Sequence, residues 1–543
     1  MRIGAKSLPK ASVDGIRGAR ILSAMRHPLI TIALLTAIVP AAAQQPRTSY
    51  NDSLVIAPLY IEYTKVSDDK FGAETQQLRQ RLGHGQHVLL GFSTFLPLDY
   101  DGTLSLERPI DASSLKPTLK DTDIVVQRAA ENGIIAHIAF VSGFFHGWNQ
   151  LREVAIREDV RNAQWFADGW IGTPNELTNP DVIPHSVWVT PSRYAVPLHR
   201  RMEESVRIVA SHLATAMAVS PDTLVSVSGD GEVELTFERN LGEGAMGRKT
   251  DDPLYTDYSP FAVAEFRDWL RNPKYSGDRT PGSDDNGDGH TFNGDYRQHF
   301  ATWDLKYFNK SGPIPFATYI QLPNKLPASG RFFKPDGFDA PRIPDAGDPL
   351  WKAWLTFRKQ MVGNYVRDFA EWVTTAPGNN GFTIPTQRYY SHQIPADYLF
   401  EQPDNIRLLT SASPVETTFI APFGGPGMTA YNIFDGNRHL RTATPLLLSR
   451  LSQQSGNWAV LEYSPSQPAR AGLPPSDDLD YYAEQLNLLY TYRPHVIVPF
   501  AWTELPEHSQ YAIQGKPFER ALARFIKKIG DNEWTRANPP AAK

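Results

Sequence analysis

Residues 458–462 read Trp-Ala-Val-Leu-Glu, a short apolar run of β character that ends on a carboxylate. Seven similar runs occur between residues 54 and 500, and segments of helical period separate most of them. This alternation is typical of βα units that build a parallel sheet. Eight strands with mostly helical connections predict an α/β fold, a (β/α)8 TIM barrel with long active-site loop insertions. The expected strands are 54–60, 87–92, 134–140, 224–228, 381–385, 416–421, 458–462 and 495–500.

Two of the segments between these runs, 349–374 and 477–490, carry apolar residues at three- and four-residue steps, as helices that cover a sheet do. Ser259 followed by Pro260 marks one helix start, because a serine cap and a proline in the first turn both favour that end. Segments 141–192 and 272–345 lack such periodicity and are expected to wall a cleft. The expected helices are 73–82, 122–132, 194–218, 260–271, 349–374, 445–454, 477–490 and 517–529.

Composition excludes several classes of protein. The chain has 543 residues, 41% of them hydrophobic and 21% charged, which suits a globular protein with a substantial core. It has no cysteine, so disulfide scaffolds, thiol nucleophiles and cysteine-ligated zinc are excluded. The formal net charge of −5 gives no electrostatic reason to expect nucleic acid as a partner.

The first 43 residues resemble a secretory signal peptide. Residues 29–39 form an apolar run of eleven, too short to span a bilayer, and Ala41-Ala42-Ala43 supplies small residues at cleavage spacing. We therefore expect an exported protein, periplasmic or secreted, without a membrane anchor after cleavage. Residues 44–543 are then one catalytic domain with an insertion at about 272–345.

Two glutamates stand at the carboxyl ends of predicted strands. The fourth strand runs into Gly229-Asp230-Gly231-Glu232, and the seventh ends on Glu462. Active sites of these barrels lie on that face, and glycosidic hydrolysis needs one protonated and one ionised carboxyl group. A single acidic residue after a strand can be an ordinary loop residue, but the pairing of strands four and seven favours catalysis. Glu234 is the competing candidate on the fourth strand.

These residues resemble the retaining glycoside hydrolases of clan A, the 4/7 superfamily. The stretch 258–271, with its Tyr, Ser-Pro and Phe…Trp-Leu, is loosely similar to the segment that follows the acid/base in family 42 β-galactosidases. The resemblance implies that Glu232 is the acid/base and Glu462 the nucleophile. It also implies that Trp502 is the aromatic platform under the sugar. Gly231 stands where the clan usually has asparagine, and the Gly-Asp-Gly-Glu run is distantly similar to a motif of β-amylases, which invert.

Aromatic and polar residues cluster after predicted strands three, five and eight. Sugars present apolar C–H faces and many hydroxyls, so a carbohydrate cleft needs aromatic platforms beside imidazole and carboxylate partners. For each aromatic residue taken singly, packing of a loop onto the barrel is an equal alternative. The predicted substrate-binding residues are Phe145, His146, Trp148, Tyr390, His392 and Trp502.

An acidic loop at 284–295 matches the spacing of an EF-hand-type calcium site, with oxygen ligands at positions 1, 3, 5 and 12 and glycine at position 6. Such strings also form plain solvent turns, and both interpretations stay open. Any ion would be structural, and no cofactor for catalysis is expected. The predicted ligands are Asp284, Asn286, Asp288, His290 and Asp295.

The sequence thus predicts an exported glycoside hydrolase that acts on a β-linked oligo- or polysaccharide by double displacement. Two alternatives remain: a non-catalytic carbohydrate-binding barrel, and an inverting glycosidase on the same barrel. The sequence gives no basis for an oligomeric state.

Overall fold

The structure is a computed structural model of the whole chain. It describes most of the barrel and the helices around it. The described residues are 50–85, 87–142, 150–164, 191–192, 194–219, 225–230, 237–238, 254–255, 257–259, 261–263, 265–266, 349–393, 420–431, 448–449, 451–452, 456–465, 479–503 and 511–530.

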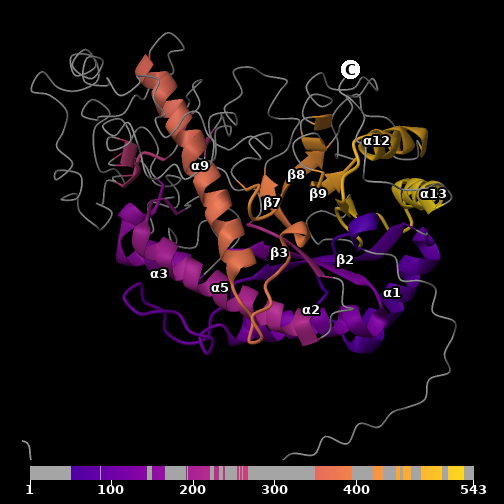
Figure 1. Cartoon of the computed structure of the whole chain (residues 1–543), viewed down its shortest axis with the longest axis horizontal. Helices are drawn as coiled ribbons and strands as arrows, with labels where there is room; N and C mark the ends of the chain where they lie inside the picture. The colour runs from indigo at the N-terminus through magenta and orange to yellow at the C-terminus, as the bar shows by residue number, and fades with distance from the viewer. Residues whose placement is uncertain are drawn as a thin grey trace, which may run out of the picture. The chain divides into compact units, whose positions relative to one another are not determined.

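Eight parallel strands close into a barrel, which confirms the predicted fold class (Figure 1). Their order around the barrel is β1-β2-β3-β4-β7-β8-β9-β10, and β10 pairs again with β1. Neighbouring parallel strands need crossover connections and cannot be joined by tight hairpins. The strands are β1 (Leu54–Ile56), β2 (Val88–Pro97), β3 (Ile135–Val141), β4 (Val225–Ser228), β7 (Tyr389–Gln393), β8 (Gly425–Tyr431), β9 (Ala459–Ser464) and β10 (Val496–Pro499).

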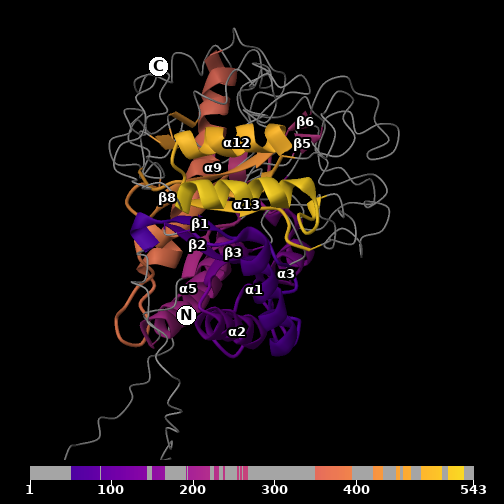
Figure 2. The ribbon, with the colours of Figure 1, turned by 90° about the vertical axis from the view of Figure 1, so that its right-hand side faces the viewer.

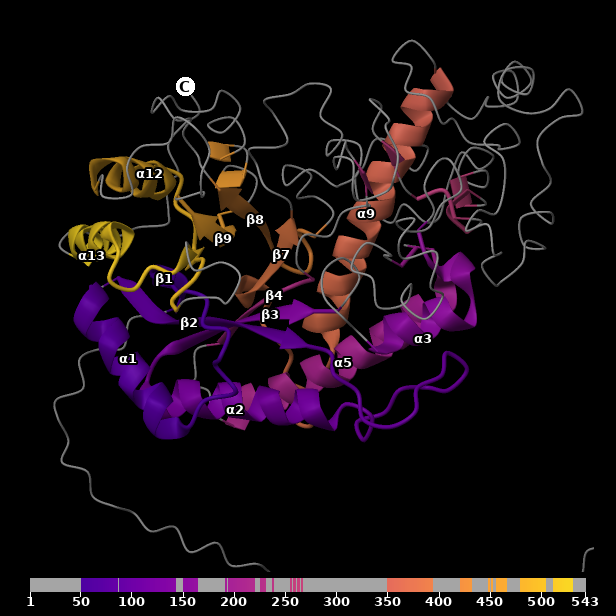
Figure 3. The same ribbon diagram turned by 180° about the vertical axis from the view of Figure 1, so that it is seen from behind.

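The described helices pack on the outside of the barrel and follow the strands in the predicted order, except α3, which lies in segment 141–192, where no helix was predicted. Figure 2 shows α12 and α13 side by side, and Figure 3 shows α5 next to α2 and α9. The Ser67 hydroxyl caps the start of α1 by accepting the Lys70 N–H at 3.3 Å, and Gly83 ends it at φ 78°. The helices are α1 (Asp68–Leu82), α2 (Lys116–Asn132), α3 (Gln150–Glu158), α5 (Val196–Val219), α9 (Pro349–Thr375), α12 (Leu479–Thr491) and α13 (Pro517–Gly530).

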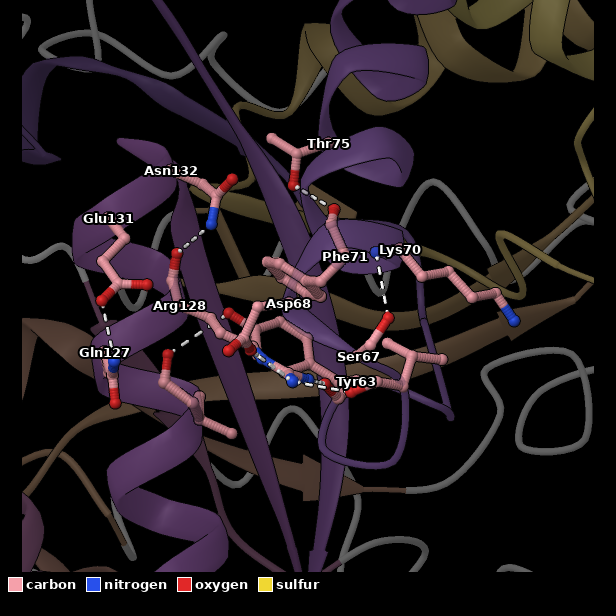
Figure 4. A network of polar contacts seen from close by, with 12 residues as sticks. Tyr63, Ser67, Asp68, Lys70, Phe71, Thr75, Gln127, Arg128, Glu131 and Asn132 are labelled. Carbon is pink, nitrogen blue, oxygen red and sulfur yellow. Dashed lines mark hydrogen bonds and ion pairs between the residues drawn. The ribbon is translucent and has the colours of Figure 1, made fainter.

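Arg128 ties α2 to the segment that leads into α1 (Figure 4). Its guanidinium donates to the carbonyls of Tyr63 and Val66 and to the Asp68 carboxylate, and it lies 5.2 Å from the centre of the Phe71 ring. Only 6% of Arg128 is exposed. The charge is thus buried with several acceptors, the condition under which a buried cation is tolerated.

Two apolar clusters arise from the alternation of side chains along the strands. The larger cluster fills the layer between barrel and helices and includes Val460, Ile497 and Tyr463. The smaller one fills the barrel interior and includes Leu461 and Val498. The side of the barrel on which a strand residue lies can therefore be read from its cluster.

Two predicted strands were wrong in position. The fifth barrel strand is β7 (Tyr389–Gln393) and not 381–385, and the sixth is β8 (Gly425–Tyr431) and not 416–421. Segment 381–385 instead connects α9 to the short helix η6 (Thr386–Arg388) and begins at Gly381, whose φ is 78°. The number of strands is unchanged, so β4 and β9 are the fourth and seventh barrel strands, as predicted.

Other expectations have mixed outcomes. The Ser259 cap is confirmed, because its hydroxyl accepts the Ala262 N–H at 3.2 Å. A two-stranded antiparallel sheet, β5 (Phe237–Glu238) with β6 (Leu254–Tyr255), was not predicted. Within the described ranges, no helix is long and apolar enough to cross a membrane. The insertion at 272–345 lies outside the described residues.

Candidate functional site

Polar side chains of β3 and β4 form a layer inside the barrel. His137 on β3 is 1% exposed, and its two ring nitrogens lie 2.8 Å from Ser226 Oγ and 3.1 Å from Ser228 Oγ on β4. Burial, and then the neighbouring His392, lower the pKa of His137 from 6.5 to about 3. The imidazole is therefore neutral at neutral pH, and it holds β3 against β4 without a charge.

A β-bulge in β9 determines the direction in which the Glu462 side chain points. Between Val460 and Tyr463, β9 advances by three residues while each neighbouring strand advances by two, so β9 holds one extra residue against both. Val460 and Tyr463 both face the helices, and Leu461 faces the barrel interior. Strict alternation would turn Glu462 towards the helices with Val460, whereas the bulge pairs it with Thr429 and leaves it partly exposed. Bulges beside active sites commonly redirect a side chain in this way.

Thr429 and His392 connect Glu462 to the polar layer. Thr429 Oγ1 donates to Glu462 Oε2 at 3.4 Å, and His392 Nε2 lies 2.7 Å from Thr429 Oγ1. Thr429 is 0% exposed and His392 5%. Of the predicted substrate-binding residues that the structure describes, His392 alone is brought next to a predicted catalytic residue. Thr429 was not predicted, because Gly425-Pro426-Gly427 before it carries no strand signal.

Asp230 lies at the end of β4 but belongs to a different network. Its carboxylate accepts the Ser142 N–H at 2.9 Å, the Ser142 hydroxyl and the Tyr365 hydroxyl at 3.0 Å. Ser142 follows β3, and Tyr365 is on α9. Asp230 is 4% exposed. It therefore joins two strand ends to a helix and is not presented to a substrate in this conformation.

The structure buries Trp502 in the apolar layer between barrel and helices. The indole is 0% exposed, packs 5.8 Å from the Phe92 ring and donates to the Glu74 carboxylate of α1 at 2.9 Å. A ring without exposed surface cannot stack on a sugar in this conformation. Phe500 is the partly exposed aromatic residue directly after β10, and it packs against the interior cluster. Phe500 stands two residues after Val498, so the side alternation of a strand predicts that both face the barrel interior.

Tyr390 lies inside the barrel at the opposite end from Glu462. Its hydroxyl is 2.6 Å from His495 Nδ1, 3.0 Å from Asn457 Oδ1 and 3.2 Å from the Tyr50 hydroxyl. These three partners precede β10, β9 and β1, so the cluster marks the amino ends of the strands. Tyr390 is 0% exposed. The structure therefore does not bring this predicted substrate contact to the carboxyl face, because 389–393 is a strand and not a loop after one.

The stretch that resembles family 42 contributes packing where it is described. The Tyr258 ring lies 4.9 Å from Trp354 on α9, and the Phe266 ring 4.8 Å from the same indole. All three residues are 0% exposed. Packing against α9 is therefore sufficient to explain the aromatic residues of this stretch, without a contact to substrate.

Several predicted residues lie outside the described residues, and the structure does not place them. They comprise the first catalytic candidate, three aromatic or histidine candidates and all proposed calcium ligands. They are Glu232, Phe145, His146, Trp148, Asp284, Asn286, Asp288, His290 and Asp295.

Comparison with solved structures identifies proteins of similar fold. The catalytic domain of a β-amylase from Paenibacillus polymyxa is 11% identical with a TM-score of 0.50, and the match covers 88% of this chain and 99% of that one. A β-galactosidase from Rahnella sp. R3 is 10% identical with a TM-score of 0.47, over 90% of this chain and 57% of that one. An exo-carrageenase of family GH42 from Bacteroides ovatus is 10% identical with a TM-score of 0.49, over 88% and 52%.

No family model matches the chain, and no curated protein does. The chain is therefore a (β/α)8 barrel with distant structural similarity to glycoside hydrolases of this architecture. At this level of identity the likeness concerns the fold, and function has to be argued from the site.

Proposed function

We propose that the chain is a glycoside hydrolase whose second catalytic carboxylate is Glu462. The observation that carries this proposal is the placement of Glu462: it is partly exposed, lies near the carboxyl end of the seventh barrel strand, faces inward through a bulge and accepts a hydrogen bond from Thr429. The carboxyl face is where barrels of this kind hold their reacting groups. A hydroxyl donor favours the ionised form of a carboxyl, the form that a nucleophile or base requires.

The reaction we propose divides the chemistry between two glutamates. Glu232 would protonate the leaving oxygen while Glu462 attacks the anomeric carbon of a β-linked sugar, and Glu232 would then activate water to hydrolyse the glycosyl ester. An inverting enzyme would instead use Glu462 as the base that activates water. The two schemes differ in the product, because the first retains the anomeric configuration and the second inverts it.

The test compares Glu462→Gln with Glu484→Gln. Glu484 is an exposed residue of α12, so its substitution makes the same chemical change away from the barrel mouth. With chromogenic glycosides that the native-sequence protein cleaves, Glu462→Gln should remove nearly all turnover and Glu484→Gln should remove none. Equal activity in both variants would contradict the role of Glu462. NMR of the first-formed anomer then separates retention from inversion.

The role of Glu232 has a separate test that also includes Glu234. If Glu232 is the acid/base, Glu232→Ala should lose less activity on aryl glycosides with good leaving groups than on natural sugars, because a good leaving group needs little protonation. Azide should partly restore turnover, since a small anion can replace the missing base. If Glu234→Ala shows this behaviour while Glu232→Ala keeps full activity, the acid/base is Glu234.

The rival function, a carbohydrate-binding barrel without catalysis, predicts a different pattern. Oligosaccharides would bind and no glycoside would be cleaved by the native-sequence protein under any condition of the screen. In that case Glu462→Gln should change affinity alone, because its carboxylate would serve only as an acceptor for sugar hydroxyls.

We also propose Phe500 as the aromatic residue beneath the sugar, in place of Trp502. Phe500 is partly exposed next to the interior cluster, whereas Trp502 is fully buried. Phe500→Ala should raise KM selectively, with some loss of stability because the ring also packs against the interior cluster. Trp502→Phe should lower the melting temperature without a selective effect on KM. The reverse pattern would restore Trp502 as the sugar contact.

Export and calcium binding complete the proposal. The apolar run at 29–39 and the alanines after it support cleavage of a signal peptide, and the acidic loop at 284–295 supports a structural calcium ion. Neither is needed for the proposed chemistry.

A further inference from the structure

Three side chains from neighbouring strands form a row that ends on Glu462. Thr429 and Glu462 are cross-strand partners on β8 and β9, while His392 on β7 is paired with Gly427 on β8. Gly427 has no side chain, so His392 reaches past it to Thr429, the next residue on the same face of β8. The row therefore depends on strand register and not on a loop.

The hydrogen positions in this row are set by the chemistry of a hydroxyl. Thr429 has one hydroxyl proton, and it is donated to Glu462 Oε2. At 2.7 Å from His392 Nε2, the Thr429 oxygen must then accept, so Nε2 carries the proton. His137 does not compete for Thr429, because both of its ring nitrogens contact serine hydroxyls.

We propose that His392 and Thr429 are positioning residues: the His392 Nε2–H fixes the Thr429 hydroxyl, which holds one carboxylate oxygen of Glu462 in place for reaction. This inference rests on the proposed function in naming the reaction. A threonine hydroxyl without the histidine could rotate and lose its direction towards Glu462. With the imidazole 95% buried behind it, the hydroxyl has a single favourable orientation.

The first arm of the test is kinetic and uses matched substitutions. Thr429→Val removes the hydroxyl at nearly constant shape, and Thr429→Ser keeps it. Thr429→Val should lower kcat about tenfold with KM nearly unchanged, the loss expected for one hydrogen bond to a charged group. Thr429→Ser should stay within about twofold of the native sequence by the same reasoning. Equal losses in both variants would overturn the proposal, because a packing defect does not distinguish them.

The second arm needs no activity. In protein with ¹⁵N-labelled histidine, NMR distinguishes protonated from unprotonated ring nitrogens, and the signals of His392 are those that disappear in His392→Gln. His392 Nε2 should be protonated in the native sequence and in Thr429→Ser, and Thr429→Val should change its signal. An unprotonated Nε2 in the native sequence would overturn the proposed row.

The two arms separate failure of this inference from failure of the proposed function. If no glycoside is cleaved but the NMR pattern is as expected, the hydrogen-bonded row stands and the hydrolase function falls. If Glu462→Gln is inactive while Thr429→Val keeps full kcat and an unchanged His392 signal, the hydrolase stands and the positioning role falls.

Discussion

Replacing His137 by glutamine should flatten the dependence of stability on pH below neutrality. His137 is buried inside the barrel, and burial together with His392 lowers its pKa from 6.5 to about 3. In the unfolded chain the imidazole takes up a proton below about pH 6.5, but in the folded barrel it stays neutral until about pH 3. Between these values the unfolded state binds one more proton, so acid favours unfolding.

The magnitude is given by the two pKa values. The contribution of His137 to the unfolding free energy is fully present above pH 6.5 and declines by up to about 1.4 kcal/mol for each pH unit below it. From pH 6 to pH 4 the loss is about 2.5 kcal/mol. His137→Gln has no such proton to bind. It should therefore lose about 2.5 kcal/mol less than the native sequence over the same interval.

Urea unfolding at pH 8, 6, 5 and 4 measures this difference. At pH 8 the imidazole is neutral in both states, so the variant reports only the packing cost of the substitution. The m-value should stay constant across the series, which shows that the two chains expose the same surface on unfolding. If both chains lose the same free energy from pH 6 to pH 4, His137 does not stay neutral in the folded barrel and the reasoning is refuted.

The other predictions concern packing, the calcium loop and export. Arg128→Leu should lower the unfolding free energy by about 2–3 kcal/mol, because the buried Tyr63 carbonyl and the partly buried Val66 carbonyl lose the guanidinium donor, and an unchanged urea midpoint would contradict this. Gly427→Ala should cost about 1–3 kcal/mol and lower kcat, since a Cβ there would lie 2.4 Å from the Ser391 carbonyl oxygen. Gly456→Ala, where a Cβ meets nothing within 4 Å, is its control and should be neutral. If the acidic loop binds calcium, a chelator should lower the melting temperature and Asp288→Ala should abolish that effect; no shift in either protein would make it a plain turn. Mass spectrometry of exported protein should find an N-terminus at or near Gln44, and a retained N-terminal segment would contradict signal cleavage.

The fold could be predicted because most of its strands are buried on both faces. A strand between a filled interior and a helix layer becomes a nearly continuous apolar run, as Leu54–Ile56 and Val496–Pro499 are. The fifth strand, Tyr389–Gln393, is not a continuous apolar run, and its His392 faces inward and contacts Thr429. The sixth contains glycines at 425 and 427, where any Cβ would collide with the neighbouring backbone. The close approach of the neighbouring strands requires these glycines, and β-propensity along the sequence does not reveal that requirement.

Site residues that stand at the ends of strands could be predicted from the sequence. Site residues that are brought together by the register between strands could not. Glu462 was identified because it ends an apolar run. Thr429 was not, because its importance comes from pairing with Glu462 across two strands that are 33 residues apart in sequence. Trp502 was placed at the barrel mouth because it comes after the eighth strand, but β10 ends at Pro499, and Phe500 and Ala501 both lie against the interior cluster, so the alternation of sides does not extend to Trp502. The chain then turns the indole towards α1.

The bulge in β9 lets one strand pack its apolar residues on both sides and still direct Glu462 towards the barrel interior. Tyr463 packs against Phe518 of α13 with ring centres 5.7 Å apart, and Leu461 fills the barrel interior, so both apolar anchors have fixed sides. With strict alternation Leu461 and Tyr463 would share a side, and Glu462 would face the apolar layer on the other. Burying a carboxylate there without partners would cost several kcal/mol. One extra residue keeps each anchor on its own side and presents the carboxylate to Thr429 at the mouth. The feature that aims the proposed nucleophile is therefore also the one that lets the strand pack.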